Sequence, residues 1–570
     1  MSSFRASVRL YSFAECRRLD AGSIAAGLPE QQLMGQAALA SYYALRDLPA
    51  FRTARRVLVL CGPGNNGGDG YALAALLGSD QQRDRSLPTP IVYASAAPKS
   101  TAAQFYAAQA QTAGVELCDA DAFVSESLRA DDLIVEALLG IGQREAPRGA
   151  IGRMLEHLLA ARINDSAREP RPCTVSLDVP AGLCENESGD SANPELAPFC
   201  PDEIHSYGVD KLALRLDRRL AAHSRVRVLP MGFAPQELQA TPATSAQPRR
   251  LVIAEDTGSQ ADGASAKRFV HEREQLRATF NKSPLDHKHS AGHGRLIGGS
   301  RGMNGALLMA AQAFFASGGG ILHVLSPDAE TMREMRARIP GAMFLDPASK
   351  LPTTLRPAAV CVGPGLAPAD LEGIARWLLP LFTNLDERYT NRALPRVILD
   401  AGALPLVRTN PGDPAPDLLD ALPREQLLLT PHTGEWQRLG GPAIHCTEDF
   451  ARAREHAAQE LRAACLVKDA VCAYLPASDS QAPGVRDRPN AGLAVAGSGD
   501  NLCGILLACA ARRRANASET VDFWFEASTA ALSLLDLSAS SSHHLRADQF
   551  ADCVRALLQA DAESTPESTS

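Results

Sequence analysis

The stretch Arg55–Gly70, RRVLVLCGPGNNGGDG, joins an apolar β-branched run to a turn that holds five glycines. The run Val57–Leu60 predicts a buried strand, and the Ala/Leu-rich segment Tyr71–Leu77 predicts a helix after the turn. Such a helix start presents backbone N–H groups and a positive dipole end, which suit phosphate or another anion. The spacing is neither the dinucleotide G-x-G-x-x-G pattern nor a P-loop, because no Lys-Ser/Thr pair follows the last glycine.

Residues 1–230 alternate between short apolar runs and Ala/Leu/Gln-rich segments. This alternation predicts a doubly wound parallel sheet that is covered by helices on both faces. The loops after its strands should line a site, because ligands bind at the carboxyl ends of such strands. The predicted strands are Val57–Leu60, Pro90–Tyr93, Asp132–Glu136, Cys173–Leu177 and Val226–Pro230.

The chain has 570 residues, which is too long for one hydrophobic core, so we expect more than one domain. We predict a first α/β domain over residues 1–233 and a linker over 234–250, which is rich in Ala, Pro, Thr and Gln. A second α/β pattern follows over 251–558. The polar and acidic residues 559–570 are predicted to form a disordered tail.

The bulk composition is that of a globular protein, with 45% hydrophobic and 21% charged residues. The formal net charge is −8 and the basic residues are dispersed, which argues against nucleic acid as a partner. The sequence contains no apolar run long enough to span a membrane, and its start lacks the apolar core of a signal peptide. The thirteen cysteines contain no CxxC pair, which favours reduced thiols. We therefore expect a cytoplasmic protein without a nucleic-acid or membrane partner.

Three further segments are expected at the same sheet edge as the glycine turn. Leu133–Gly142 (LIVEALLGIG) is a strand followed by a glycine turn, and Ser176–Gly182 (SLDVPAG) places Asp178 at the end of a strand. The third is the region around Asp210 and Lys211. Core packing does not explain an acid at a strand end beside a proline-glycine turn, although a helix-cap or turn role stays open for it.

The second domain carries its clearest signal at Ala494–Gly504, AVAGSGDNLCG. A small-residue turn there leads to Asp500 at the start of an apolar helix, Asn501–Ala511. Backbone amides at such a turn can form an anion hole, and Asp500 beside it can deprotonate a hydroxyl that attacks phosphorus. The alternative role for Asp500 is a helix N-cap. Five motifs precede this turn: Arg295–Gly305 (RLIGGSRGMNG), Val362–Leu366 (VGPGL), Leu399–Leu404 (LDAGAL), Thr430–Glu435 (TPHTGE) and Val467–Ala470 (VKDA).

The motifs GPGNNGGDG, EALLGIG and DVPAG resemble the N-terminal epimerase domain of the bifunctional NAD(P)H-hydrate repair enzymes. The resemblance implies a Rossmann-like sheet that interconverts the R and S epimers of hydrated NADH or NADPH. It implies that Asp178 is the acid/base near the epimerising carbon. The implied substrate-binding residues are Asn65, Asn66, Gly67, Gly68, Asp69, Gly140, Ile141 and Gly142.

The same resemblance implies a potassium ion held by Asn66, Glu136 and Ala181. Two of these depart from the family pattern, because the family has Asp where this chain has Glu136 and Ser where it has Ala181. Ala181 offers only its backbone carbonyl, so we expect weakened potassium binding. Loss of the epimerase activity stays an alternative.

The second series of motifs resembles the ribokinase-like α/β dehydratase half of the same enzymes, over residues 285–555. The resemblance implies Mg²⁺ and ADP (ATP in some members) for dehydration of the S hydrate to NAD(P)H, with AMP and phosphate released. It implies Asp500 as the base on the hydrate's hydroxyl. The implied hydrate contacts are Ala306, Gly365 and His432, although His432 could instead be a solvated loop residue. The implied nucleotide contacts are Lys468, Asp469, Ala470, Val471, Cys472 and Gly499.

Two motifs of this half also depart from the family. Lys-Gly-Ala-Gly-Thr reads Lys468-Asp-Ala-Val-Cys, and Asp-Ala-Asp-Ala-Leu reads Asp400-Ala-Gly-Ala-Leu, so that Gly402 replaces a carboxylate. We expect weak nucleotide affinity, because the added carboxylate of Asp469 would repel phosphates. Two alternatives stay open, a ribokinase-like small-molecule kinase and a nucleotide-binding protein with one or both sites inactive. We expect NADH or NADPH hydrate and ADP as ligands, and a homo-oligomer.

Overall fold

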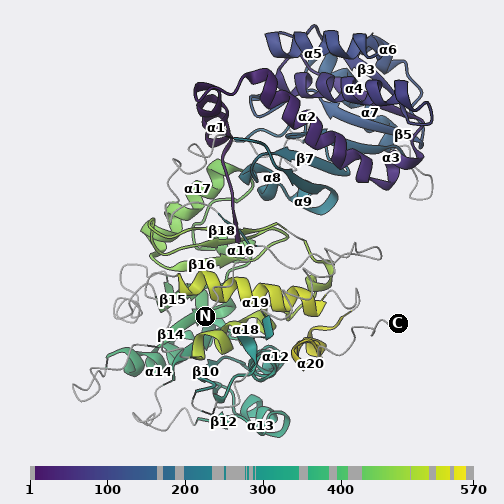
Figure 1. Cartoon of the computed structure of the whole chain (residues 1–570). Helices are drawn as coiled ribbons and strands as arrows, with labels where there is room; N and C mark the ends of the chain where they lie inside the picture. Colours follow the sequence, from purple (N-terminus) through teal and green to yellow (C-terminus); the bar gives the residue numbers. More distant parts are fainter. Residues whose placement is uncertain are drawn as a thin grey trace. The chain divides into compact units, whose positions relative to one another are not determined.

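The structure is a computed structural model of the chain and divides into two compact units (Figure 1). One unit comprises Val8–Arg250 and Ile444–Ala451, and the other comprises Met1–Ser7, Leu251–Ala443 and Arg452–Ser570. The described residues are 7–163, 171–185, 198–233, 249–251, 276–277, 279–281, 287–288, 290–345, 357–383, 395–407, 426–487, 489–512, 522–539 and 545–559.

The first unit contains a parallel seven-stranded sheet in the order β4-β3-β2-β5-β6-β7-β8, counted over the described residues. All five predicted strands are present within one residue or two of their predicted ends. The two unpredicted strands, β4 and β7, are rich in polar residues. In β7 the buried ring of His205 lies 3.1 Å from Glu203 Oε1 and 3.1 Å from Ser41 Oγ, so these polar groups are buried by bonding to one another. The strands are β2 (Arg56–Cys61), β3 (Thr89–Ala94), β4 (Glu116–Asp119), β5 (Asp132–Ala137), β6 (Cys173–Leu177), β7 (Glu203–Tyr207) and β8 (Arg225–Leu229).

Helices cover both faces of this sheet, which confirms the doubly wound α/β prediction (Figure 1). Val57 and Val59 of β2 pack against α2, α4 and α5, whereas Leu58 and Leu60 face the opposite side and pack against α6 and α7. This alternation is the two-residue period of a strand that is buried on both faces. The helices are α1 (Phe13–Ala25), α2 (Glu30–Asp47), α3 (Pro49–Thr53), α4 (Asn65–Arg83), α5 (Thr101–Thr112), α6 (Ala120–Val124), α7 (Gly149–Ile163), α8 (Leu212–Leu216) and α9 (Arg218–His223).

Helix α4 begins earlier than the sequence predicts. The expected turn over the glycines ends at Gly64, and α4 starts at Asn65, so the remaining glycines lie inside its first two turns. The reason is close packing: a Cβ on Gly67 would lie 1.9 Å from the Gly62 carbonyl oxygen. Only a residue without a side chain lets the helix start this close to the end of β2.

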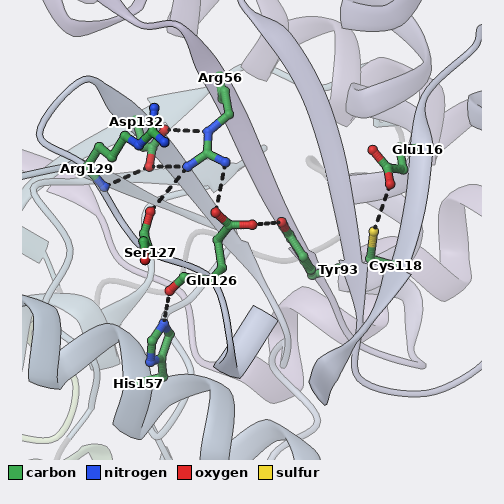
Figure 2. Close-up of polar contacts among 9 residues, drawn as sticks. All are labelled: Arg56, Tyr93, Glu116, Cys118, Glu126, Ser127, Arg129, Asp132 and His157. Atoms are coloured by element: carbon green, nitrogen blue, oxygen red, sulfur yellow. Dashed lines mark hydrogen bonds and ion pairs between the residues drawn. The ribbon is translucent and has the colours of Figure 1, made fainter. Parts of the chain in front are cut away.

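A polar network ties β2 to β5 at the amino ends of these strands (Figure 2). Arg56 donates from Nε and Nη2 to the two carboxylate oxygens of Asp132, each at 2.8 Å, and from Nη1 to Glu126 at 3.0 Å. Tyr93 Oη donates to Glu126 at 2.8 Å. Because Arg56 and Asp132 are also register partners in the sheet, the pair fixes the alignment of β2 and β5.

The second unit is built on a sheet of eleven strands over the described residues, in the order β1-β9-β18-β17-β16-β15-β14-β13-β10-β11-β12. Seven neighbouring strands run parallel: β12, β11, β10, β13, β14, β15 and β16. Strand β17 is antiparallel to β16, and β18 is antiparallel to β17. The strands are β1 (Ser7–Arg9), β9 (Arg249–Leu251), β10 (His293–Ile297), β11 (Ile321–Leu325), β12 (Met343–Phe344), β13 (Ala359–Val362), β14 (Arg396–Leu399), β15 (Leu427–Leu429), β16 (Ala464–Val467), β17 (Cys472–Leu475) and β18 (Gly484–Arg486).

The main core of this unit lies between one face of the sheet and the helices α12, α18, α19 and α20. Leu502, Cys503 and Leu506 of α18 are fully or almost fully buried there, as expected for a helix that is apolar nearly all round. The helices of the unit are α12 (Asn304–Ala316), α13 (Ala329–Arg338), α14 (Leu371–Thr383), α16 (Thr433–Arg438), α18 (Ser498–Ala511), α19 (Phe523–Ala539) and α20 (Phe550–Gln559); α17 (Thr447–Glu455) spans the boundary between the units.

Two of the predicted segments fall mostly outside the described residues. Residues 234–248 of the predicted linker are not described, and Arg249 and Arg250 form part of β9. Residues 560–570 of the predicted tail are not described, and Gln559 is the last residue of α20. Among the helices of the described residues, none is long and apolar enough to cross a membrane.

We predict that Gly67→Ala destabilises the first unit by at least about 2 kcal/mol, because the new Cβ would displace α4 from the end of β2. Native-state hydrogen exchange of the α4 amides in the full chain measures this change. Gly64→Ala is the matched control, since a Cβ there has no heavy atom within 4 Å. Equal exchange in both variants would contradict the packing argument.

Candidate functional site

A cleft of about 550 Å³ lies at the carboxyl edge of the first unit's sheet. It is lined by the start of α4, by the loops after β5, β6 and β7, and by α1 and α2. The structure therefore brings together segments that are far apart in the sequence, as the parallel topology predicts. The sequence-predicted residues that line it are Asn65, Asn66, Asp69, Gly140, Ile141, Gly142 and Asp178.

Gly67 and Gly68 do not line this cleft. A Cβ on Gly67 would meet the Gly62 carbonyl, and a Cβ on Gly68 would lie 2.5 Å from the methyl carbon of Met34. Both glycines are buried where α4 packs against its neighbours. The substrate contacts predicted for them are therefore not what the structure shows, and their role is to let the helix approach.

Asp178 lies at the floor of the cleft in a strained conformation. Its φ of +61° is in the left-handed region, which non-glycine residues seldom adopt outside functional sites. Its Oδ1 lies 2.8 Å from Lys211 Nζ and accepts the Tyr207 backbone N–H at 3.3 Å. The Asp178 carboxylate is therefore held in one orientation by two donors.

Lys211 is the partner that makes this arrangement stable. Its side chain is only 2% exposed, and Nζ also donates to Ser206 Oγ at 3.0 Å and to the Tyr207 carbonyl at 3.1 Å. Burial has the largest single effect and lowers the pKa of Lys211, but the charge and hydrogen bond of Asp178 together with the nearby Cys16 and Asp20 outweigh it, so the pKa is raised. Sequence reasoning named the Asp210–Lys211 region without this pairing.

Three further carboxyl groups, Asp20, Glu30 and Asp69, line the cleft. Burial, together with the charge of Asp178, raises the pKa of Asp20 to about 6. Burial and the charges of Asp178 and Asp20 raise the pKa of Asp69 well above its usual value. Sequence analysis gave Asp20 no role, although it lies one turn after the buried Cys16 on α1 and hence on the covered face of that helix.

The residues predicted to hold potassium lie beneath the cleft floor. Glu136 is fully buried, and its carboxylate accepts from Leu138 N at 2.8 Å, Ser176 Oγ at 2.7 Å and Ala181 N at 3.2 Å. Burial raises the pKa of Glu136 to about 7, against the effect of these hydrogen bonds. The Ala181 carbonyl accepts the Phe199 N–H at 2.8 Å.

Asn66 supplies an oxygen with unused bonding capacity at the same place. Its Nδ2 donates to the Leu139 carbonyl at 2.7 Å, which turns the other side of the amide toward the protein interior. Its Oδ1 is buried and has no hydrogen-bond partner within the part of the chain that the structure describes. A buried oxygen without a donor is costly, and a cation would satisfy it.

In the second unit, Asp500 lies in the first turn of α18. The N-cap of this helix is Gly497, so the N-cap role considered for Asp500 is wrong. Burial and the charge of Asp400 raise the pKa of Asp500 to about 6, while Lys468 acts to lower it. With a pKa of about 6, Asp500 is mostly ionised at neutral pH.

Lys468 connects Asp500 to the end of β14. Its Nζ lies 2.6 Å from Asp400 Oδ1, which also accepts from Thr430 Oγ1 at 2.7 Å. The same Nζ would lie 3.2 Å from a Cβ on Gly499, which places the ammonium at the amino end of α18. An ammonium next to a helix N-terminus favours an anion such as phosphate.

The residues after Lys468 form a turn with mixed orientations. Asp469 accepts from Thr433 Oγ1 at 2.6 Å and from Ala470 N at 2.6 Å, so its carboxylate ties this turn to α16. Ala470 is exposed, whereas Val471 and Cys472 are buried. Cys472 Sγ lies 3.2 Å from the Asp469 carbonyl oxygen, which directs the thiol away from solvent.

His432 is an exposed helix cap rather than a free loop residue. Its Nδ1 accepts from Gly434 N at 3.0 Å, and its backbone N–H donates to Glu435 Oε2 at 2.9 Å, forming a capping box at the start of α16. A bridge pairs it with Lys468. The other two predicted hydrate contacts, Ala306 and Gly365, adjoin one another, since a Cβ on Gly365 would lie 3.1 Å from the Ala306 Cβ.

Two family models match the chain. A model described as NAD(P)H-hydrate dehydratase matches residues 295–548, and one described as YjeF-related protein N-terminus matches residues 30–213. Together they cover most of the chain, and each falls mainly within one of the two structural units.

Full-length curated relatives match across both halves. The bifunctional NAD(P)H-hydrate repair enzyme Nnr of Escherichia coli (strain K12) is 29% identical over 492 residues, which are 84% of this chain and 80% of the relative. The Nnr enzyme of Coxiella burnetii is 29% identical over 524 residues, 89% of this chain and 91% of the relative.

A solved structure of an ADP/ATP-dependent NAD(P)H-hydrate dehydratase from Bacillus subtilis, co-crystallised with ATP and Mg²⁺, is 25% identical. It covers 50% of this chain and 95% of its own, with a TM-score of 0.37. Because the two family models cover most of the chain in succession and the relatives match across both, the chain belongs to the bifunctional NAD(P)H-hydrate repair enzymes.

Proposed function

We propose that the first unit interconverts the R and S hydrates of NADH and NADPH, and that the second unit dehydrates the S hydrate at the expense of ADP or ATP. With ADP, the products are the reduced nucleotide, AMP and phosphate. The observation that carries the proposal is that each unit places one aspartate near a largely buried lysine at the carboxyl edge of a parallel sheet: Asp178 with Lys211, and Asp500 with Lys468.

In the first unit, Asp178 would act as the acid/base on the hydroxyl group of the carbon that is inverted. The Lys211 ammonium and the Tyr207 N–H hold its carboxylate in place. The amino end of α4, with Asn65 at its start and the exposed Lys99 on the cleft rim, would bind the diphosphate.

A potassium ion fits beneath this cleft. The unpartnered Asn66 Oδ1, the Glu136 carboxylate and the Ala181 carbonyl would hold it. When bound, the ion supplies a positive charge that favours the ionised form of Glu136. Its proposed effect on this chain's residues is to order the loops after β5 and β6, which carry Gly140 and Asp178.

In the second unit, Asp500 would take the proton of the hydrate's hydroxyl as its oxygen attacks the nucleotide phosphorus. Lys468 and the α18 amides would receive the phosphates at the same place. The phosphate of the resulting ester is a good leaving group, and its departure together with a proton from the neighbouring ring carbon restores the ring double bond. Within the described residues no cluster of three or more His, Cys, Asp and Glu side chains could hold a metal ion, so Mg²⁺ would arrive bound to the nucleotide phosphates.

The direct test is recovery of reduced-nicotinamide absorbance from a mixture of NADH-hydrate epimers, with purified protein, ADP, Mg²⁺ and K⁺. Recovery of both epimers faster than spontaneous epimerisation supports both activities. Recovery that stops at the S fraction leaves the dehydratase and excludes the epimerase. No recovery with ADP or with ATP would overturn the proposal and favour a small-molecule kinase or a binding protein.

We predict that potassium stabilises the first unit more at about pH 8 than at about pH 6. The folded-state pKa of Glu136 is about 7, above the unfolded value of about 4.3. Its contribution to stability is therefore full below the unfolded pKa and is lost as the pH rises through 7, where a bound cation would restore it. Calorimetric Tm values in KCl and in choline chloride at equal ionic strength measure the effect.

Asn66→Ala should abolish this potassium effect, because it removes the unpartnered oxygen. Asn65→Ala is the matched control, since Asn65 is exposed and donates to Glu30 at 2.6 Å. A potassium effect that is equal at the two pH values, or that survives in Asn66→Ala, would count against the ion site.

We predict that kcat/KM of the dehydratase falls as the pH drops below about 6, since Asp500 must be ionised to act as a base. Lys468→Met should move this limb up by about one pH unit, because the ammonium lowers the pKa of Asp500. Asp400→Asn should move it down by a similar amount, because the Asp400 charge raises the same pKa. Limbs that stay in place in both variants would exclude Asp500 as the titrating base.

We predict that restoring the family's aspartate with Gly402→Asp lowers the free energy of unfolding of the second unit by at least about 2 kcal/mol. A Cβ at this position would lie 1.9 Å from the Leu366 carbonyl oxygen, so the loop has no room for a side chain. Tryptophan fluorescence during urea unfolding follows this unit alone, because Trp377, Trp436 and Trp524 all belong to it. Gly373→Asp, where a Cβ has no heavy atom within 4 Å, is the control, and equal midpoints for both variants would refute the steric argument.

A further inference from the structure

Two carboxyl groups of the first unit's cleft have opposite surroundings. Asp178 is ion-paired to the buried Lys211 at 2.8 Å and accepts a backbone N–H. Asp20, on α1, lines the same cleft, and no hydrogen bond or ion pair joins its carboxyl to the residues that the structure describes. Carboxyl groups whose environments differ in this way take opposite roles in acid–base catalysis.

The charges around Asp20 favour its protonated form. Asp178, across the cleft, and Glu30, at the start of α2, both raise its pKa, as does burial, which has the largest effect. Lys211 acts in the other direction, but its ammonium is already bonded to Asp178. The result is a pKa of about 6, so Asp20 is mostly ionised at pH 7 but keeps a larger protonated fraction than an ordinary aspartate, and this fraction grows as the pH falls toward 6.

Epimerisation of a hydrate requires both a proton acceptor and a proton donor. Water adds to an enamine with its hydroxyl on the carbon next to nitrogen, so the inverted carbon bears both a hydroxyl and the ring nitrogen. Breaking the carbon–nitrogen bond requires that the hydroxyl lose a proton and that the nitrogen gain one. A single carboxylate cannot do both at once.

We propose that Asp20 is a second catalytic residue of the epimerase site, which donates a proton to the ring nitrogen while Asp178 takes the hydroxyl proton. This inference rests on the proposed function of the first unit. The carbon–nitrogen bond breaks, its electron pair goes to the nitrogen, and the hydroxyl carbon becomes an aldehyde. Rotation about the adjacent carbon–carbon bond presents the other face. Ring closure then reverses both transfers. The ring nitrogen returns its proton to Asp20, and Asp178 returns its proton to the oxygen, with no oxidation or reduction.

The neighbouring carboxyl groups fit the donor role less well. Glu30 accepts from Asn65 Nδ2 at 2.6 Å, which ties it to the start of α4. Asp69 lies within the first two turns of α4, among the residues proposed to bind the substrate. Asp20 is therefore the carboxyl that combines an open position with a suitable acidity.

The test is the pH dependence of epimerase kcat/KM in the full chain, with an excess of a separate S-specific dehydratase so that epimerisation limits the rate. In the wild type, kcat/KM should fall as the pH rises above about 6, because the donor must be protonated. Asp20→Asn should lower kcat/KM by about 10²-fold or more and remove this limb. Asp20→Glu should keep a limb at a shifted position. Asp47→Asn is the control, because Asp47 is exposed and lies outside the cleft lining, and it should stay within about threefold of the wild type, with its limb intact.

The outcomes separate this inference from the proposed function. A wild type without epimerase activity overturns the proposed function of the first unit and this inference with it. An active wild type whose rate and limb persist in Asp20→Asn overturns the inference alone. A limb that disappears in Asp69→Asn but stays in Asp20→Asn assigns the donor to Asp69 and also overturns it. If Asp20→Asn unfolds, as shown by lost α1 hydrogen-exchange protection, the limb position in Asp20→Glu decides: an unshifted limb excludes Asp20.

Discussion

A lysine ammonium that reaches an aspartate at the carboxyl edge of a parallel sheet organises each of the two sites. In the first unit Lys211 joins the end of β6 to the loop after β7 through Asp178, and in the second Lys468 joins the end of β16 to the end of β14 through Asp400. Removing one partner of a buried pair leaves an uncompensated charge and typically costs about 3–5 kcal/mol. The strand-end loops are therefore held in register by the same charges that prepare the sites for anionic ligands.

Close backbone contacts set the second constraint on the dehydratase site. The loop after β13 approaches the end of β14 so closely that a Cβ on Gly363 would lie 1.8 Å from the Asp400 carbonyl oxygen, and Gly402 meets Leu366 in the same way. Gly402 therefore reads as part of a tightened loop rather than as a carboxylate lost from an otherwise unchanged site. The added carboxylate of Asp469 likewise accepts a hydrogen bond from Thr433. This bond reduces the repulsion of the nucleotide phosphates that the sequence alone suggests.

The sequence predicts five of the seven strands of the first unit's sheet and names Asp178 and Asp500 as candidates, because an apolar β-branched run and a glycine turn are local signals. It does not predict β7, since Glu203 and His205 look polar until each is paired with the other inside the protein. It places the start of α4 too late, because glycines weaken a helix except where packing requires their small size. Asp20 was missed for a similar reason. Its importance comes from Asp178, which is far away in sequence and is brought near only by the fold.

The two sites differ in how many carboxyl groups their chemistry needs. Dehydration only removes protons, one from the hydroxyl, which Asp500 would take, and one from the neighbouring ring carbon when the phosphate leaves, so the site beside Lys468 needs no protonated carboxyl group. Inversion of a carbon leaves the substrate with the same bonds that it had before. Each proton that the enzyme takes from the substrate must therefore be matched by one that it gives. A site of this kind gains from an ionised group and a protonated group in one cleft, and Lys211 separates them by pairing with Asp178 and leaving Asp20 without a cation of its own.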